Sequence, residues 1–96
     1  MEKYELTIIF PEECNDIERT KVEQIIRSFS QITKVEEDGV KRLAYAIVAR
    51  GKEHDSGRFV YYDLYMPREN VVKLSGALNI NDMVMRYLLV KADPRY

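Results

Sequence analysis

The sequence predicts an α+β fold in which two helices cover one face of a four-stranded antiparallel sheet. The first observation is the order of the segments: stretches with the period of a strand and stretches with the period of a helix follow one another as β-α-β-β-α-β. The second is that no linker, repeat or low-complexity stretch interrupts the 96 residues, which predicts a single domain over residues 1–96. Together these features are typical of the ferredoxin-like split arrangement.

The first strand and the first helix are indicated by apolar residues at the spacing of each element. Every second residue from Tyr4 to Phe10 is apolar, and Pro11 ends the strand because it lacks a backbone N–H. Asn15 or Asp16 is expected to cap the helix that follows. The apolar face of this helix is expected to consist of Val22, Ile25, Ile26, Phe29 and Ile32.

The stretch Lys34–Arg50 predicts one long strand with a kink. Its residues alternate strictly from Arg42 onward, but the apolar residues upstream are out of phase with that alternation. Gly39 is the expected position of a bulge or bend, because a glycine inside a strand pattern most often marks one. An acidic arm therefore precedes the bend, the basic pair Lys41 and Arg42 follows it, and an apolar arm ends the strand.

The third strand is expected to follow a mobile loop. Gly51–Gly57 has the glycine and polar composition of a loop, in which His54 would be solvated. The strand period resumes over Arg58–Met66. Its more apolar side carries Val60, Tyr62, Leu64 and Met66, and its other side carries Phe59, Tyr61, Asp63 and Tyr65.

The last two elements are a short helix and a strand. Pro67 and Glu69 are expected to open the helix, and Asn79 is expected to close it in the left-handed conformation. Met83–Lys91 predicts the final strand. Because both helices are expected on the same side, the opposite face of the sheet would have no cover of its own, and exposed apolar and aromatic surface commonly marks an interaction site.

The composition argues against several classes of function. A net charge of −1 argues against a generic polyanion binder, so any nucleic-acid contact must come from locally clustered cations. The lone Cys14 and the lone His54 provide neither a metal cluster nor a nucleophilic pair, and we therefore expect no enzyme, no cofactor and no metal. The single cysteine indicates a reducing cytoplasm, and no apolar run is long enough to cross a membrane.

Four stretches resemble the small-subunit ribosomal protein S6 family of bacteria and organelles: KYELTIIF, VEEDGVKRLAYAI, FVYYDLYMP and INDMVMRYLLVK. The resemblance covers essentially the whole chain in the right order. It implies a ferredoxin-like fold and a structural role in the small ribosomal subunit of the cytoplasm or of an organelle matrix. It also implies binding to the central domain of small-subunit ribosomal RNA and pairing with ribosomal protein S18, with no membrane contact and no small-molecule substrate.

Two sets of residues are expected to make these contacts. Basic residues on strands or at their ends are rigidly placed, and with one tyrosine they form the expected RNA-binding set Lys3, Tyr4, Lys41, Arg42, Arg86 and Lys91. Contact with the partner protein is expected from the second strand and the uncovered face, through Leu43, Tyr45, Phe59 and Tyr61, with Tyr45 and Phe59 as anchors.

Two alternative functions remain open. Asn79, Asn81 and Met85 stand in a region where the family is commonly rich in arginine, which favours a paralogous protein–protein adaptor with little direct RNA binding. The stretch GRFVYY, from Gly57 to Tyr62, has aromatic residues on a strand, which would also suit a stand-alone RNA-binding module that stacks single-stranded bases.

Overall fold

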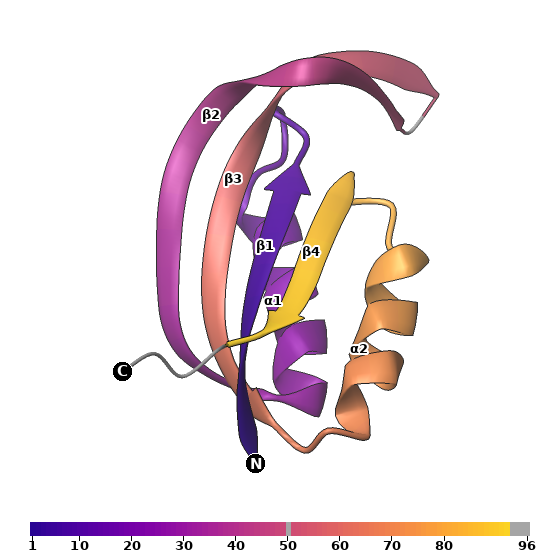
Figure 1. The fold of residues 1–96 in the computed structure, drawn as a ribbon. Helices are drawn as coiled ribbons and strands as arrows, with labels where there is room; N and C mark the ends of the chain where they lie inside the picture. Colours follow the sequence, from indigo (N-terminus) through magenta and orange to yellow (C-terminus); the bar gives the residue numbers. More distant parts are fainter. Residues whose placement is uncertain (50, 93–96) are drawn as a thin grey trace.

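The computed structural model describes residues 1–49 and 51–92, and it confirms the expected fold. The strands form one antiparallel sheet in the order β2-β3-β1-β4, and both helices lie on the same side of it (Figure 1). The elements are β1 (Glu2–Phe10), α1 (Asp16–Phe29), β2 (Gln31–Ala49), β3 (Lys52–Met66), α2 (Asn70–Asn79) and β4 (Arg86–Lys91).

The core lies between the helices and one face of the two central strands. Alternate residues of β1 and of β3 are buried, and they meet the buried residues of α1 and α2. The expected apolar side of β3 is therefore confirmed as the core side. The fully buried side chains include Leu6, Ile8, Phe10, Val22, Ile26, Val60, Tyr62, Leu64, Met66, Leu74 and Leu78.

Helix α1 begins with a capping box at Asn15. The Asn15 side-chain oxygen accepts a hydrogen bond from the Glu18 amide at 2.8 Å, and the Glu18 carboxylate accepts one from the Asn15 amide at 3.2 Å. The helix ends at Phe29, because Ser30 has an extended backbone. The placement of Ile32 on the helical face was therefore wrong: Ile32 lies in β2 and packs against the core from there.

Helix α2 and the start of β4 also differ from the expectation. Asn79 is the last helical residue, and the C-cap is Ile80 with φ −94° and ψ 1°, so the left-handed ending at Asn79 was wrong. Strand β4 begins at Arg86 instead of Met83. The reason is a turn in which the Asn81 side chain accepts a hydrogen bond from the Met83 amide at 2.9 Å.

The long strand β2 has the expected bulge. Its register with β3 shifts between Glu37 and Gly39, where Gly39 has a φ of 81° that a residue with a side chain rarely adopts. A second irregularity was not expected: Arg42 pairs with Ser56 and Ile47 pairs with His54, so the β2 segment 43–46 faces the single β3 residue at position 55. The β2–β3 ribbon bends here over the end of the sheet (Figure 1).

The expected loop Gly51–Gly57 is instead paired strand for most of its length. Strand β3 begins at Lys52, and pairs with β2 continue down to Ala49 and Lys52. His54 is only 6% exposed, opposite the equally buried Ile47, so the expectation of a solvated histidine was also wrong. The composition of this segment is typical of a loop, but β2 provides hydrogen-bond partners for its backbone N–H and C=O groups.

Gly57 allows the ribbon to cross closely over the end of β1. A Cβ atom at this position would lie 2.5 Å from Ile9 Cγ2, 3.0 Å from Met85 Cε and 3.1 Å from the Phe10 carbonyl oxygen. The Phe10 oxygen belongs to the backbone of a central strand and cannot move aside cheaply. A glycine is therefore required where the ribbon leaves the sheet.

We predict that Gly57→Ala lowers the free energy of unfolding by about 1–3 kcal/mol, the usual cost of overpacking a filled site. Gly76→Ala is the matched control, because Gly76 lies in α2 and an added Cβ would meet no atom within 4 Å beyond its chain neighbours and the backbone of its own helix. That control should be neutral or stabilising by up to about 1 kcal/mol. Urea unfolding of both variants measures the difference, and equal stabilities would contradict the close crossing.

Candidate RNA and protein interface

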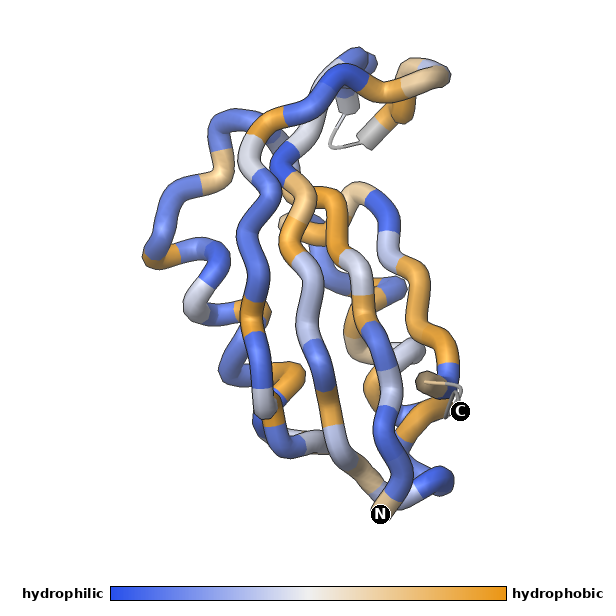
Figure 2. Tube along the Cα trace, turned by 60° about the vertical axis from the view of Figure 1, so that its left-hand side comes forward, coloured by the Kyte–Doolittle hydropathy of each residue, from blue (hydrophilic) through white to orange (hydrophobic). Residues whose placement is uncertain are grey.

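The face of the sheet opposite the helices is open to solvent, as expected. Side chains that alternate with the core residues point to this side, and the register places those of neighbouring strands in rows. Figure 2 shows the resulting change between hydrophilic and hydrophobic residues along each strand. The open face includes Lys3, Glu5, Thr7, Ile9, Lys34, Glu36, Phe59, Tyr61, Asp63, Tyr65, Arg86, Leu88 and Val90.

At the bulge of β2, four side chains form one polar and aromatic cluster. The Lys41 ammonium forms an ion pair with Asp38 and lies 5.7 Å from the centroid of the Phe59 ring. The Tyr61 hydroxyl donates a hydrogen bond to the same Asp38 carboxylate at 3.3 Å. The structure thus brings together one residue of the expected RNA-binding set, Lys41, and two residues of the expected partner-binding set, Phe59 and Tyr61.

The ion pair in this cluster changes the acidity of both partners. The hydrogen bond from Lys41 lowers the pKa of Asp38, and the same bond raises the pKa of Lys41. Because the pKa of Asp38 is lowered below that of an unfolded aspartate, the pairing is complete above the ordinary value of about 3.9 and is lost as the pH falls through the lowered value. At neutral pH, Lys41 is therefore a cation already engaged by a carboxylate.

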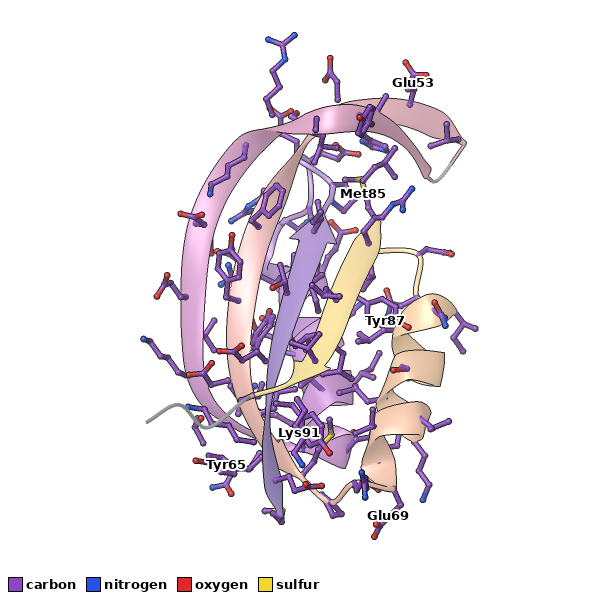
Figure 3. All side chains as sticks on the ribbon, viewed as in Figure 1. Glu53, Tyr65, Glu69, Met85, Tyr87 and Lys91 are labelled. Carbon is purple, nitrogen blue, oxygen red and sulfur yellow. The ribbon has the colours of Figure 1, made fainter. Side chains whose placement is uncertain are left out.

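Three further residues of the expected RNA-binding set lie near the opposite end of the sheet. Figure 3 shows Lys91 and Tyr65 near that end, whereas Met85 lies near the other. The Lys91 ammonium forms an ion pair with Glu2 at 2.6 Å, and Lys3 lies 4.0 Å from Asp63. Tyr4 is only 5% exposed and faces the core, and its hydroxyl donates to Glu2 at 3.2 Å. The Tyr4 ring therefore does not join the open face.

Arg42 and Arg86 are the exposed members of the set with no carboxylate partner in the part of the chain that the structure describes. Arg42 lies directly before the irregular segment 43–46 of β2. Arg86 begins β4 and is paired with Ile9, which places its side chain on the open face at the end where Lys41 lies. These two guanidinium groups are free to bind an anionic group.

The expected partner-binding residues do not form one patch. Phe59 and Tyr61 lie half-buried on the open face, whereas Leu43 and Tyr45 lie on the arm of the β2–β3 ribbon. The Tyr45 side chain is 86% exposed. It projects because the segment 43–46 has left the regular ladder, a feature that the strict alternation of the sequence concealed.

A carboxylate that sequence reasoning missed holds the bulge in place. Glu37 forms ion pairs with Arg19 of α1 and, at 2.5 Å, with Arg58 of β3. Arg58 also donates a hydrogen bond to the Cys14 carbonyl oxygen at 2.7 Å. Glu37 therefore links β2 to β3 and to the first helix. A signal in the sequence was the position of Glu37, two residues before the bend predicted at Gly39.

The described ranges 1–49 and 51–92 contain no group of three or more histidine, cysteine, aspartate or glutamate residues that could hold a metal ion. Neither helix in them is long and apolar enough to reach across a lipid bilayer.

Comparison with known proteins points to one family. A family model described as ribosomal protein S6 matches residues 3–91. The small ribosomal subunit protein bS6 of Thermus thermophilus is 30% identical over 97 residues, which cover 96% of this chain and 92% of that protein. The crystal structure of 30S ribosomal protein S6 from Thermotoga maritima has a TM-score of 0.79 at 22% identity and covers 95% of this chain and 87% of that one. This structural likeness confirms the fold.

We predict that Asp38→Asn lowers the pKa of Lys41 toward the ordinary lysine value of about 10.4, because the hydrogen bond that raises it is removed. The pKa can be followed by NMR of the side-chain ammonium group. Asp63→Asn is the matched control, since it removes the carboxylate near Lys3 and leaves the Lys41 pair intact. A Lys41 pKa that is the same in all three proteins would argue against the ion pair.

Proposed function

The chain belongs to the ribosomal protein S6 family, and from this premise we propose that it is a structural constituent of the small ribosomal subunit, acting as a single non-enzymatic domain over residues 1–96. It binds the central domain of small-subunit ribosomal RNA together with ribosomal protein S18, on ribosomes of the cytoplasm or of an organelle. The observation that carries this proposal is the open face: it carries Arg86, which has no carboxylate partner among residues 1–49 and 51–92, and it continues into an arm with an exposed tyrosine.

RNA contact is assigned first to the end of the sheet where Lys41, Arg42 and Arg86 lie. Guanidinium groups bind phosphate with two parallel hydrogen bonds, and neither arginine has to break an existing ion pair to do so. Lys41 can exchange the Asp38 carboxylate for a phosphate. Lys3 and Lys91, which are paired with Asp63 and Glu2, provide a second and weaker contact at the far end.

Partner contact is assigned to the arm and to the adjoining open face. Tyr45 has the exposure and the shape of an anchor that enters a pocket on the partner, and Val48 on the same arm is also exposed. Phe59 and Tyr61 offer a flatter aromatic surface beside it. A chain with a net charge of −1 gains little from long-range attraction to RNA, so docking beside S18 would supply the missing affinity.

One observation favours the alternative of a protein–protein adaptor with the same fold. Lys3, Lys41 and Lys91 each form an ion pair with a carboxylate of this chain, so that within the expected RNA-binding set only Arg42 and Arg86 have no such partner among the described residues. The third possibility, stacking of single-stranded bases, is disfavoured because the Lys41 ammonium already lies over the Phe59 ring.

The direct test is sedimentation of the tagged full-length protein from cells that produce it. Most of the protein is expected to migrate with small ribosomal subunits on a sucrose gradient and to remain with them at moderate salt. Tagged protein found only at the top of the gradient would overturn the proposed role. Recovery in particles after mild treatment with ribonuclease, but with no crosslink to RNA, would favour the adaptor.

We predict different effects for the cationic and the aromatic residues in binding to central-domain RNA with S18. Replacing both Lys41 and Arg42 by glutamine should reduce the salt dependence of binding by roughly 1.4–1.8 units of slope, because each phosphate that is no longer neutralised lowers the slope by about 0.7–0.9. Tyr45→Ala should leave the slope unchanged and weaken the complex with S18 by roughly 30-fold, as removal of an interface anchor does.

Lys73→Gln is the control for these variants, because Lys73 is an exposed lysine on α2, on the helical side of the sheet. Filter binding over a range of salt concentrations measures the slopes, and titration calorimetry measures the affinity for S18. If the double variant retains the slope of the unmodified protein, the assignment of phosphate contacts to Lys41 and Arg42 is wrong.

A further inference from the structure

The part of β2 that carries Lys41 has no buried side chain to fix its register. Every residue from position 36 to position 42 is exposed or half-buried. A strand is held firmly in register where one of its faces is buried, and weakly where its residues are polar or glycine. The sequence of this segment, EEDGVKR, is of the second kind. Polar contacts must therefore decide which residue of the segment is the extra one in the bulge.

The bulge determines the side of the sheet on which Lys41 lies. Residues that pair directly across an antiparallel ladder point to the same side, and Lys41 pairs with Gly57, two residues from Phe59. Asp38 has no pair in β3 and is the extra residue of the bulge. Without an extra residue, Lys41 would face Ser56, and its side chain would point to the helical side of the sheet. The bulge is therefore the reason that Lys41 lies on the open face.

Glu37 directly precedes the extra residue, and its carboxylate is held from two other elements. It pairs with Val60 and so lies on the helical side, where it forms ion pairs with Arg19 of α1 and Arg58 of β3. These three charged side chains are 36%, 23% and 20% exposed, whereas Lys41 is 48% exposed. Solvent and salt therefore screen the contacts of Glu37 less than they screen the ion pair of Lys41.

The two arginines are themselves fixed by the surrounding structure. Arg19 Nε lies 3.5 Å from the Glu23 carboxylate, which accepts a hydrogen bond at 3.0 Å from the hydroxyl of the buried Tyr62. Arg58 donates a hydrogen bond to the Cys14 carbonyl oxygen at 2.7 Å. The position of the carboxylate that they share is thus set by the core and by the turn before α1.

We propose that Glu37 is a positioning residue for phosphate binding, because it fixes the bulge and thereby keeps Lys41 on the open face beside Phe59. This role rests on the proposed contact of Lys41 with RNA, although Glu37 itself lies on the opposite side of the sheet. Loss of the Glu37 carboxylate lets the extra residue move along β2. Lys41 then spends part of its time on the helical side.

The first test uses the free full-length protein and does not depend on RNA. In Glu37→Ala, we expect weaker nuclear Overhauser effects between the Lys41 side chain and the Phe59 ring. We also expect the pKa of Lys41 to move toward the ordinary lysine value, because its ion pair with Asp38 forms for less of the time. The matched control is Glu36→Ala, which removes the same charge from the neighbouring position on the open face and should change neither signal.

Binding to central-domain RNA with S18 supplies a test based on the sign of the effect. If charge alone matters, removal of a carboxylate strengthens the attraction to phosphate, so Glu36→Ala should bind at least as tightly as the unmodified protein. Glu37→Ala should instead bind roughly three- to fivefold more weakly, the size expected of one exposed ion pair. Its salt dependence should fall by up to about 0.9 units of slope, the contribution of one phosphate contact.

Arg19→Gln is a milder variant for the case that Glu37→Ala does not fold. It removes one ion pair of Glu37 and leaves the other, with Arg58, in place. In the free protein it should change the two Lys41 signals in the same direction and by a smaller amount. Thermal unfolding of each variant confirms that it is folded before the signals are compared.

Three results would overturn the proposal. They are unchanged Lys41 signals in folded Glu37→Ala, equal changes in Glu36→Ala, and tighter binding of RNA by Glu37→Ala than by the unmodified protein. Failure of the unmodified protein to bind RNA would contradict the proposed function instead. In that case the Lys41 signals of the free protein still decide whether Glu37 fixes the position of Lys41.

Discussion

The packing of both helices against a single face of the sheet is the constraint on which the rest of the structure depends. Val22 and Ile26 of α1 and Leu74 and Leu78 of α2 are buried against alternate residues of β1 and β3, and this contact supplies the apolar core of the domain. A strand that places every second side chain in the core must place the others outside. The open face is therefore a direct consequence of the core.

The same constraint explains why most of the fold could be predicted from the sequence. The period-two pattern of β1 and of the second half of β3, and the helical pattern of α1, each place their apolar residues in the core. The bulge at Gly39 could also be found, because an extra residue in one strand reverses the alternation of sides beyond it, and glycine readily adopts the backbone angles that this requires.

The errors arose where backbone pairing, not side-chain pattern, decides the structure. Gly51–Gly57 has the composition of a loop, yet β2 supplies its backbone partners and buries His54. The segment 43–46 alternates like a strand but faces only one residue of β3. Prediction of the candidate site was limited in the same way. The sequence shows that Lys41, Lys3 and Lys91 are cations, but it does not show that each forms an ion pair with a carboxylate of the same chain.

The order of strands has a consequence for synthesis of the chain. Strand β1 is central and is made first, but its partners are β3 and β4, and Tyr4 pairs with Lys91 near the other end of the sequence. The β2–β3 hairpin needs only neighbouring residues and can form early, whereas β1 cannot gain both neighbours until the last strand has left the exit tunnel. The sheet is therefore incomplete until β4 has been made, and the nascent chain must keep the apolar side of β1 from other contacts until then.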